Sequence, residues 1–224
     1  MSQTTRLKLT VVQARKYIGG LTTTSKMPCP SYSLPAQACK TGSKLVSIVG
    51  SVCYGCYALR GFYQFKQGKN AREIRLASIY KQDWVQAMVT VLESRRDKSY
   101  FRWHDSGDVQ SLMHLGNIME VAKRTPNTKH WLPTREYKFM KDYVESGGDV
   151  PANMYVRIST YMIDGIPPLR FADTLNKQVE GFIGVSGVSK DKMVADCPAY
   201  EQGGRCDECR TCWTTKENVV YPFH

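Results

Sequence analysis

The clearest pattern of apolar and polar positions along the chain is helical. Between Asn70 and about Ser94 the apolar residues recur near i, i+3 and i+4 spacing, which predicts a helix. Asn70 and Glu73 resemble a capping box, with Asn in the place of the usual Ser or Thr. The pattern therefore predicts a helix that begins near Asn70.

Short apolar runs alternate with helical patterns farther along the chain. Strands are predicted over 99–104, 128–133, 153–159 and 180–185, and helices over 109–123 and 137–145, with a weaker segment around 169–174. Strands that alternate with helices indicate parallel βαβ units. We therefore expect an α/β fold with βα repeats over 70–190, in a single domain that spans residues 1–224.

Polar residues follow several of these predicted strands. In chain order they are Asp105, Ser106, Gly107, Asp108, Arg135, Glu136, Ser159 and Ser186. Because the carboxyl ends of parallel strands carry the site in α/β folds, these residues predict a polar pocket. Two alternatives stay open: Ser106 or Asp108 can cap the next helix, and the charged residues can form ordinary surface pairs. His104 and His130 each lie beside a Trp, where packed, hydrogen-bonded histidines are more common than chemically active ones.

Residues 19–56 are rich in Gly, Pro, Ser and Thr, which is typical of an irregular but ordered loop. A loop of this length is uncommon unless it is functional or fixed by other contacts. Metal coordination by its cysteines would fix it.

The eight cysteines fall into two groups. They are Cys29, Cys39, Cys53 and Cys56, then Cys197, Cys206, Cys209 and Cys212. Each group has a C-x2-C pair and a Cys-Pro step, and the second runs C-x8-C-x2-C-x2-C over residues 197–213. Bacterial ferredoxins present sulfur to iron–sulfur clusters with similar spacing. The spacing predicts that all eight cysteines are metal ligands, in one or two 4Fe–4S clusters.

Zinc and disulfides are the alternatives for these cysteines. The N-terminus lacks the apolar region of a secretory signal, and no apolar run has the length of a membrane span. We therefore expect a cytoplasmic protein with free thiols and no membrane contact. Four-cysteine zinc sites usually separate their C-x2-C pairs by about 15–20 residues, whereas the pairs here are far apart in sequence. Iron–sulfur is favoured over zinc, and zinc over disulfides.

The composition, 42% hydrophobic and 23% charged, is that of a soluble globular protein. The net charge of +11 predicts attraction to nucleotides or nucleic acid. Lys66, Lys69, Arg72 and Arg75 have helical spacing and could face phosphates. A solvated helix face explains the same spacing and is the favoured interpretation, since charge clusters are small and dispersed.

Several motifs together resemble a known family. They are GSVCYGCYAL followed by a helix, one strand that ends in SGD, a later strand that ends in TRE, and GRCDECRTCW near the C-terminus. Over about 27–213 the chain resembles the phage "gene product 88"-like family, which is distantly similar to radical S-adenosylmethionine (SAM) proteins. The resemblance implies a partial (β/α) barrel like the radical SAM fold, with a 4Fe–4S cluster in the loop before the first helix.

The resemblance also implies roles for residues. Cys39, Cys53 and Cys56 would leave one iron open for SAM, which is cleaved reductively in radical SAM enzymes. The Asp105–Asp108 segment would hold the SAM amino group, with Glu136 at the next strand end, and Ser159 and Ser186 would lie near its ribose and adenine. The second cysteine group would bind an auxiliary cluster.

The chain also departs from the radical SAM pattern. The spacing is C-x13-C-x2-C in place of C-x3-C-x2-C, and Gly55 stands where an aromatic residue is usual. Cys29 could supply a fourth thiolate to the first group and close its open iron.

Three functional hypotheses follow from the sequence. The first is a radical-SAM-like enzyme of unknown substrate in the cytoplasm of an infected host. The second is a non-catalytic iron–sulfur protein, with a redox or nucleic-acid partner, for electron transfer, redox sensing or nucleic-acid binding. The third is a structural zinc protein.

Overall fold

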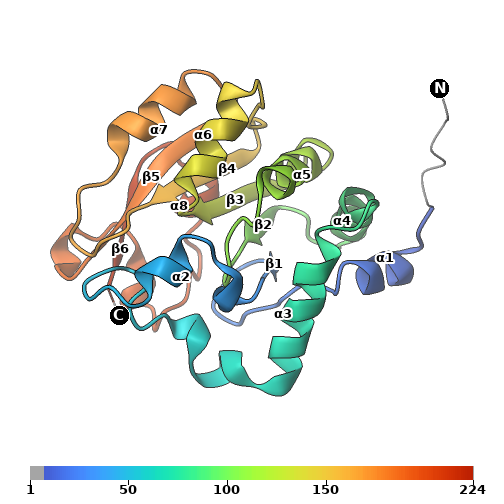
Figure 1. Cartoon of the computed structure of the whole chain (residues 1–224), viewed down its shortest axis with the longest axis horizontal. Coiled ribbons are helices and arrows are strands. Elements are labelled where there is room, and N and C mark those ends of the chain that lie inside the picture. Colours follow the sequence, from blue (N-terminus) through green and yellow to red (C-terminus); the bar gives the residue numbers. More distant parts are fainter. Residues whose placement is uncertain (1–7, 224) are drawn as a thin grey trace.

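The structure is a computed structural model that describes residues 8–223. Its centre is one sheet of six strands (Figure 1). The strands are β1 (Ser31–Tyr32), β2 (Tyr100–Trp103), β3 (Lys129–Thr134), β4 (Met154–Ser159), β5 (Phe182–Ser189) and β6 (Val219–Pro222). All neighbouring strands are parallel and follow one another in chain order. The α/β class is confirmed, and the sheet is open rather than closed.

Eight helices accompany the sheet in the described part of the chain. They are α1 (Val11–Tyr17), α2 (Gly42–Leu45), α3 (Lys66–Ser78), α4 (Trp84–Glu93), α5 (Leu112–Lys123), α6 (Tyr137–Glu145), α7 (Leu169–Asn176) and α8 (Thr211–Thr214). Short 3-10 turns occupy 36–38, 57–59, 61–64, 192–194 and 198–200. None of the helices described is both long and apolar enough to span a bilayer.

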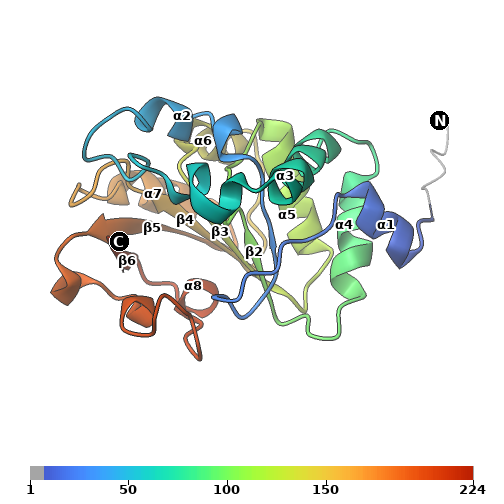
Figure 2. The same ribbon diagram turned by 90° about the horizontal axis from the view of Figure 1, so that it is seen from below.

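The two faces of the sheet are buried by different parts of the chain. Successive strand residues point to opposite faces, and on β3 Leu132 belongs to the large core whereas Trp131 belongs to a small separate cluster. The large core contains residues of α4, α5, α6 and α7. The small cluster contains Trp213 of α8, so the C-terminal segment covers the opposite face of the sheet (Figure 2).

The single helix predicted over 70–94 is wrong. Two helices, α3 and α4, replace it, and a turn separates them. Asn70 lies inside α3 rather than at its cap. The apolar periodicity came from α4, which buries Trp84 and Met88, whereas α3 buries the polar side chains of Arg75 and Ser78. Arg75 donates hydrogen bonds to the carbonyls of residues 19 and 20, so α3 is held by polar contacts that apolar periodicity does not detect.

The four central strands, α6 and α7 lie where the sequence predicted them, within a few residues. Helix α5 begins at Leu112 rather than near Val109, because Ser111 caps it by accepting a hydrogen bond from the backbone of His114. Neither Ser106 nor Asp108 is therefore a cap. The sequence analysis did not predict α1, α2, β1 or β6.

Candidate metal centres

Three cysteines of the first group lie together at the carboxyl ends of the strands. Cys39 precedes α2, and Cys53 and Cys56 form a tight turn in which the Cys56 N–H donates to the Cys53 carbonyl at 3.1 Å. A Cβ atom added at Gly42 would stand 3.6 Å from the sulfurs of both Cys39 and Cys53. It would also stand 3.0 Å from the Cβ of Cys39, which is closer than an ordinary contact, so glycine lets α2 begin close to these two thiols.

Glu136 fixes the loop that carries Cys39. One carboxylate oxygen accepts a hydrogen bond from the Thr41 N–H at 2.8 Å, and the other accepts from the Thr41 hydroxyl at 2.9 Å. Farther along, Ser51 and Met162 form an antiparallel bridge. The first Cys-rich loop is therefore ordered by hydrogen bonds to the segments after β3 and β4.

Burial keeps the Cys39 and Cys53 thiols in their protonated form. It raises the pKa of Cys39 well above its usual range, and the nearby Asp108 carboxylate raises it further. Burial also raises the pKa of Cys53, although Arg135 offsets part of this effect. A thiolate here needs a compensating positive charge, which a bound metal supplies.

Asp105 connects β1 to β2. Its carboxylate accepts hydrogen bonds from the hydroxyls of Ser31 and Ser33, and from Tyr63 at 3.0 Å. The Ser106 hydroxyl donates to the Leu34 carbonyl at 2.7 Å. These two residues are already engaged with the β1 segment, so their contacts explain the architecture of the site before any ligand is considered.

Glycine is required at position 107 for two reasons: its backbone has a left-handed conformation, and it packs closely against the β1 segment. Its φ is +79°, which favours glycine, and an added Cβ would stand 2.6 Å from the Cβ of Leu34. The chain can pass so close to the β1 segment only with glycine at this position.

The Asp108 carboxylate acts on the first cysteine site, where its charge raises the pKa of Cys39 and Cys53 beyond the effect of burial. It accepts hydrogen bonds from the Thr134 hydroxyl at 2.7 Å and from the Arg135 N–H at 2.9 Å. Burial raises its pKa to about 6, against the lowering effect of these bonds. Arg135 is in turn held by the Thr160 carbonyl.

Ser159 and Ser186 form a buried pair on neighbouring strands. They face each other in the register of β4 and β5, and their hydroxyl oxygens are 3.0 Å apart. The structure thus brings together these two candidates.

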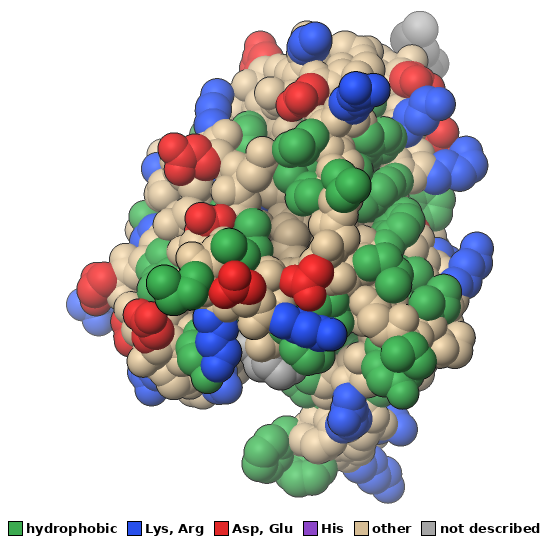
Figure 3. Space-filling view, turned by 90° about the vertical axis from the view of Figure 1, so that its left-hand side faces the viewer, with side chains coloured by type: hydrophobic (Ala, Val, Ile, Leu, Met, Phe, Trp, Pro, Cys, Tyr) green, Lys and Arg blue, Asp and Glu red, His purple; other side chains and the backbone are tan. Residues whose placement is uncertain are grey.

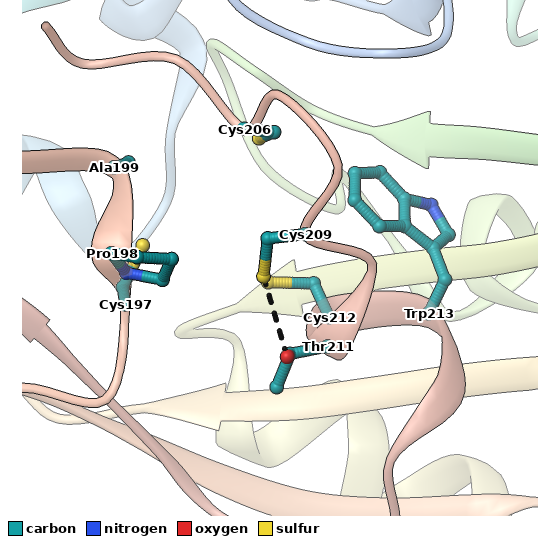
Figure 4. A pocket seen from close by; sticks show the side chains of 8 residues that line it. All are labelled: Cys197, Pro198, Ala199, Cys206, Cys209, Thr211, Cys212 and Trp213. Carbon is teal, nitrogen blue, oxygen red and sulfur yellow. Dashed lines mark hydrogen bonds between the residues drawn. The ribbon is translucent and has the colours of Figure 1, made fainter. Parts of the chain in front are cut away.

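The second cysteine site lies in the C-terminal segment. Cys197, Cys206, Cys209 and Cys212 line a cavity of about 20 Å³, together with Trp213 (Figure 4). The Cys209 N–H donates to the Cys206 carbonyl at 2.8 Å, which closes a turn between them. The Cys206 N–H donates to the Lys26 carbonyl at 2.9 Å, so the N-terminal loop supports this site.

Cys29 belongs with the second site rather than the first. Its buried side chain packs in the small cluster with Trp131, Trp213 and Cys212, and its electrostatic neighbours include Cys206. The grouping made from the sequence is wrong here because Cys29 precedes β1, whereas Cys39 follows it. The eight cysteines therefore divide into three and five.

Arg102 is a residue of interest that the sequence analysis missed. Its guanidinium lies 4.4 Å from the centre of the Trp131 ring, and its Nε has no hydrogen-bond partner among residues 8–223. Its positive charge lowers the pKa of Cys29 and Cys206, against the raising effect of burial. Its alternation with the apolar residues Phe101 and Trp103 is the signal that would have placed it on the opposite face.

The histidines behave as packed side chains. His130 accepts a hydrogen bond from the Trp103 indole N–H and is hydrogen-bonded to the Thr125 hydroxyl. Burial lowers the pKa of His130 to about 3. Burial lowers the pKa of His104 to about 4, and its φ of +56° is unusual for a residue other than glycine. Both rings are uncharged near neutral pH.

All eight cysteines are free thiols. Between residues 8 and 223, no group of three or more His, Cys, Asp or Glu side chains has an arrangement that could hold a metal ion. Any metal centre at either site therefore requires the sulfurs to move toward a common point.

Comparison with known proteins identifies a family. A family model described as Gene product 88 matches residues 2–215, which is nearly the whole chain. No curated protein and no solved structure matches. Similarity to radical SAM proteins stays a prediction.

Proposed function

The chain belongs to the Gene product 88 family, a phage gene-product family, and we propose that it is a radical-SAM-like iron–sulfur protein with two cluster sites. Cys39, Cys53 and Cys56 would hold one 4Fe–4S cluster, and Cys197, Cys206, Cys209 and Cys212 the other. The observation that carries this proposal is the separation of Cys29 from the first site, because three thiols leave one iron without a protein ligand.

The donor atoms of the first site fit a cluster once the sulfurs move toward a common point. All three ligands are thiols, the donors that iron–sulfur clusters use. Gly42 lies close to the Cys39 and Cys53 side chains, and a larger residue there would crowd them. A cluster with an open iron supplies an electron for reductive cleavage of SAM when both are bound. The open, parallel sheet with strands in chain order is compatible with the partial barrel that this chemistry uses.

The chain's own residues have positioning and binding roles in this proposal. Glu136 holds the Cys39 loop through Thr41, and Asp105 holds β1 against β2. Asp108 and Arg135 lie beside the thiols and would contact the charged amino and carboxylate groups of SAM. The hydroxyls of Ser159 and Ser186 would bind its ribose.

A second candidate function rests on the second site. Four thiols line this one cavity and can supply a protein ligand to each of the four irons of a cluster. A fully ligated cluster serves electron transfer or redox sensing. A protein that loads only this site would be a non-catalytic iron–sulfur protein. The third candidate, a structural zinc protein, requires the same thiols to bind zinc in tetrahedral geometry.

The test is anaerobic purification with iron, sulfide and zinc quantified, followed by electron paramagnetic resonance of the reduced protein with and without SAM. The proposal expects about eight irons and a signal that changes when SAM is added, two 4Fe–4S clusters being the full complement. Iron near half that amount with a signal indifferent to SAM favours the closed-cluster function. Zinc in place of iron overturns both.

Variants separate the two sites. Cys53→Ala should remove the SAM-responsive signal and leave the other, whereas Cys209→Ala should do the reverse. Cys29→Ala is the matched control for the first site, because it also removes one thiol from the N-terminal group. Loss of the SAM-responsive signal in Cys29→Ala would contradict the assignment of an open iron.

A further inference from the structure

The net positive charge of the chain comes entirely from its N-terminal third. Residues 1–72 contain 11 of the 31 Lys and Arg residues and none of the 20 Asp and Glu residues. The remaining residues contain 20 basic and 20 acidic side chains, so they carry no net formal charge. The entire excess of +11 therefore belongs to the segment that builds the first cysteine site and the first half of α3.

Part of this segment also exposes aromatic side chains. Phe62 is 83% exposed and Phe65 is 61% exposed, and their ring centres are 5.3 Å apart in an edge-to-face pair. Tyr54 and Tyr57 are exposed on the same stretch of chain, at either side of Cys56. Leaving large apolar rings in water costs free energy that the fold does not recover, which marks a surface for contact with a partner.

Two of the basic residues beside these rings have no ion-pair partner in the described part of the chain. Lys66 and Lys69 are exposed at the start of α3, and neither takes part in the four salt bridges between described residues. Arg72 lies over the Tyr63 ring at 5.2 Å. We call residues 54–72 the aromatic–basic surface; it contains four basic and no acidic residues.

The aromatic–basic surface projects from the body of the protein. In Figure 1 it forms the lower edge of the molecule, drawn in cyan and teal. Figure 3 shows hydrophobic and basic side chains at the lower tip, with the acidic side chains above it. A partner can therefore reach the rings and the lysines together.

We infer that the aromatic–basic surface binds single-stranded nucleic acid. Proteins that bind single strands combine cationic side chains for the phosphates with exposed rings on which bases stack. Both elements are present here on one stretch of chain, without acidic residues to oppose the phosphates. The surface is next to the first cysteine site, because Tyr57 directly follows Cys56 and its hydroxyl donates to the Asp105 carbonyl.

The shape of the surface disfavours the competing partners. A membrane-bound helix needs a continuous apolar face, whereas α3 exposes Lys66, Gln67, Lys69 and Asn70 in its first turns. Duplex DNA presents phosphates but no free base faces, so it would use the lysines and leave Phe62 and Phe65 in water. Free bases are the partner that uses both rings and charges.

Binding does not require a cluster, so this inference stands apart from the proposed function. If both hold, single-stranded nucleic acid becomes the substrate class of the first site. Failure of one is visible without the other, because binding is measured by fluorescence anisotropy and cluster content by iron.

The experiment uses the full-length protein and a fluorescent strand of about 20 nucleotides and mixed sequence, as DNA and as RNA, a length that covers more than one binding site of about 4–16 nucleotides. Matched duplexes and anionic lipid vesicles are the competing probes. We expect tighter binding to at least one single strand than to either duplex, with affinity that falls as salt rises. Equal affinity for single strands and duplexes, binding to vesicles alone, or no binding at low salt would overturn the inference.

Two double variants have different signatures. Phe62→Ala/Phe65→Ala should weaken single-strand binding by about tenfold or more and keep the salt dependence, because only stacking is lost. Lys66→Gln/Lys69→Gln should reduce the slope of log affinity against log salt by roughly 1.4, since about 0.7 is lost per phosphate contact. Unchanged binding in both variants would refute the site.

Matched controls lie elsewhere on the surface. Ile166→Ala/Met193→Ala removes two comparably exposed apolar side chains. Lys177→Gln/Lys216→Gln removes two exposed lysines that also take part in none of the salt bridges between described residues. Each control should bind like the wild-type protein. Circular dichroism confirms that every variant is folded, and a control as weak as its partner variant would contradict the location of the surface.

Discussion

Two buried tryptophans in the small cluster provide a matched test of how the C-terminal segment is attached to the sheet. Trp213 is 1% exposed, and its indole N–H donates to the Phe101 carbonyl at 2.9 Å. Trp131 is 6% exposed, and its indole N–H has no partner in the described part of the chain. The two rings pack against each other with centres 5.1 Å apart.

Replacement of either residue by Phe removes the same atoms from the same cluster. Trp213→Phe also removes the indole hydrogen bond to the Phe101 carbonyl, which contributes about 0.5–1.5 kcal/mol, while that carbonyl keeps its place in the ladder with β3. Trp131→Phe removes a buried N–H that bonds to nothing, and the relief of its desolvation cost offsets the weaker stacking of Arg102. We therefore expect the free energy of unfolding to be lower in Trp213→Phe than in Trp131→Phe by about 1 kcal/mol.

Urea unfolding followed by circular dichroism measures this difference. With a denaturant slope of about 2–3 kcal/mol per molar, the midpoints should differ by roughly half a molar. Since Trp213 follows Cys212 directly, Trp213→Phe should also reduce iron at the second site more than at the first. Equal midpoints, or a lower midpoint for Trp131→Phe, would refute the view that the Trp213 hydrogen bond attaches this segment.

Three further predictions concern the two cysteine sites. Because burial raises the pKa of Asp108 to about 6, the folded chain binds this proton more tightly than the unfolded chain. The free energy of unfolding should therefore fall by about 2 kcal/mol between pH 4 and 6, and Asp108→Asn should flatten that fall in urea titrations. Burial raises the pKa of Cys29 to about 12, so at pH 8 about one thiol in ten thousand is ionised. Mass spectrometry should show iodoacetamide labelling Cys29 later than the half-buried Cys206, and the reverse order would show that Cys29 is not buried. Gly42→Ala places a Cβ 3.0 Å from the Cβ of Cys39 and should lower first-site iron by about half or more, because the added methyl group displaces the Cys39 side chain. Gly116→Ala, with only an ordinary contact at 3.6 Å, is its control, and equal iron in both would contradict this role of Gly42.

The sequence predicted the centre of the fold because local patterns are strong there. Strands β2 to β5 are apolar runs, and helical patterns lie between them, so the period of the pattern changes at each boundary. Strand β1 has only two residues, and its stability comes from pairing with β2, about 70 residues away. No local pattern reports such a pairing, which is why β1 was missed.

The sequence predicted which cysteines form the two sites but not how the cysteines divide between them. The Cys-x2-Cys spacing correctly brought Cys53 and Cys56 into one turn, because that relation is local. Cys29 and Cys39 are ten residues apart in sequence, yet β1 lies between them, so Cys29 precedes the strand and Cys39 follows it. Sequence distance is therefore a poor guide to ligand grouping wherever a strand intervenes.

Strand β1 consequently decides which thiols can share a centre. Asp105 holds it through the hydroxyls of Ser31 and Ser33. Leu34, which follows the strand, donates its N–H to the Ser106 carbonyl at 2.9 Å, so the chain stays attached to the segment after β2 before it reaches Cys39. These bonds fix the position of Cys29 on one side and of Cys39 on the other. Asp105, which the sequence pattern assigned to ligand binding, therefore also has a structural role. Without its hydrogen bonds to β1, the positions that divide the cysteines into three and five would not be fixed.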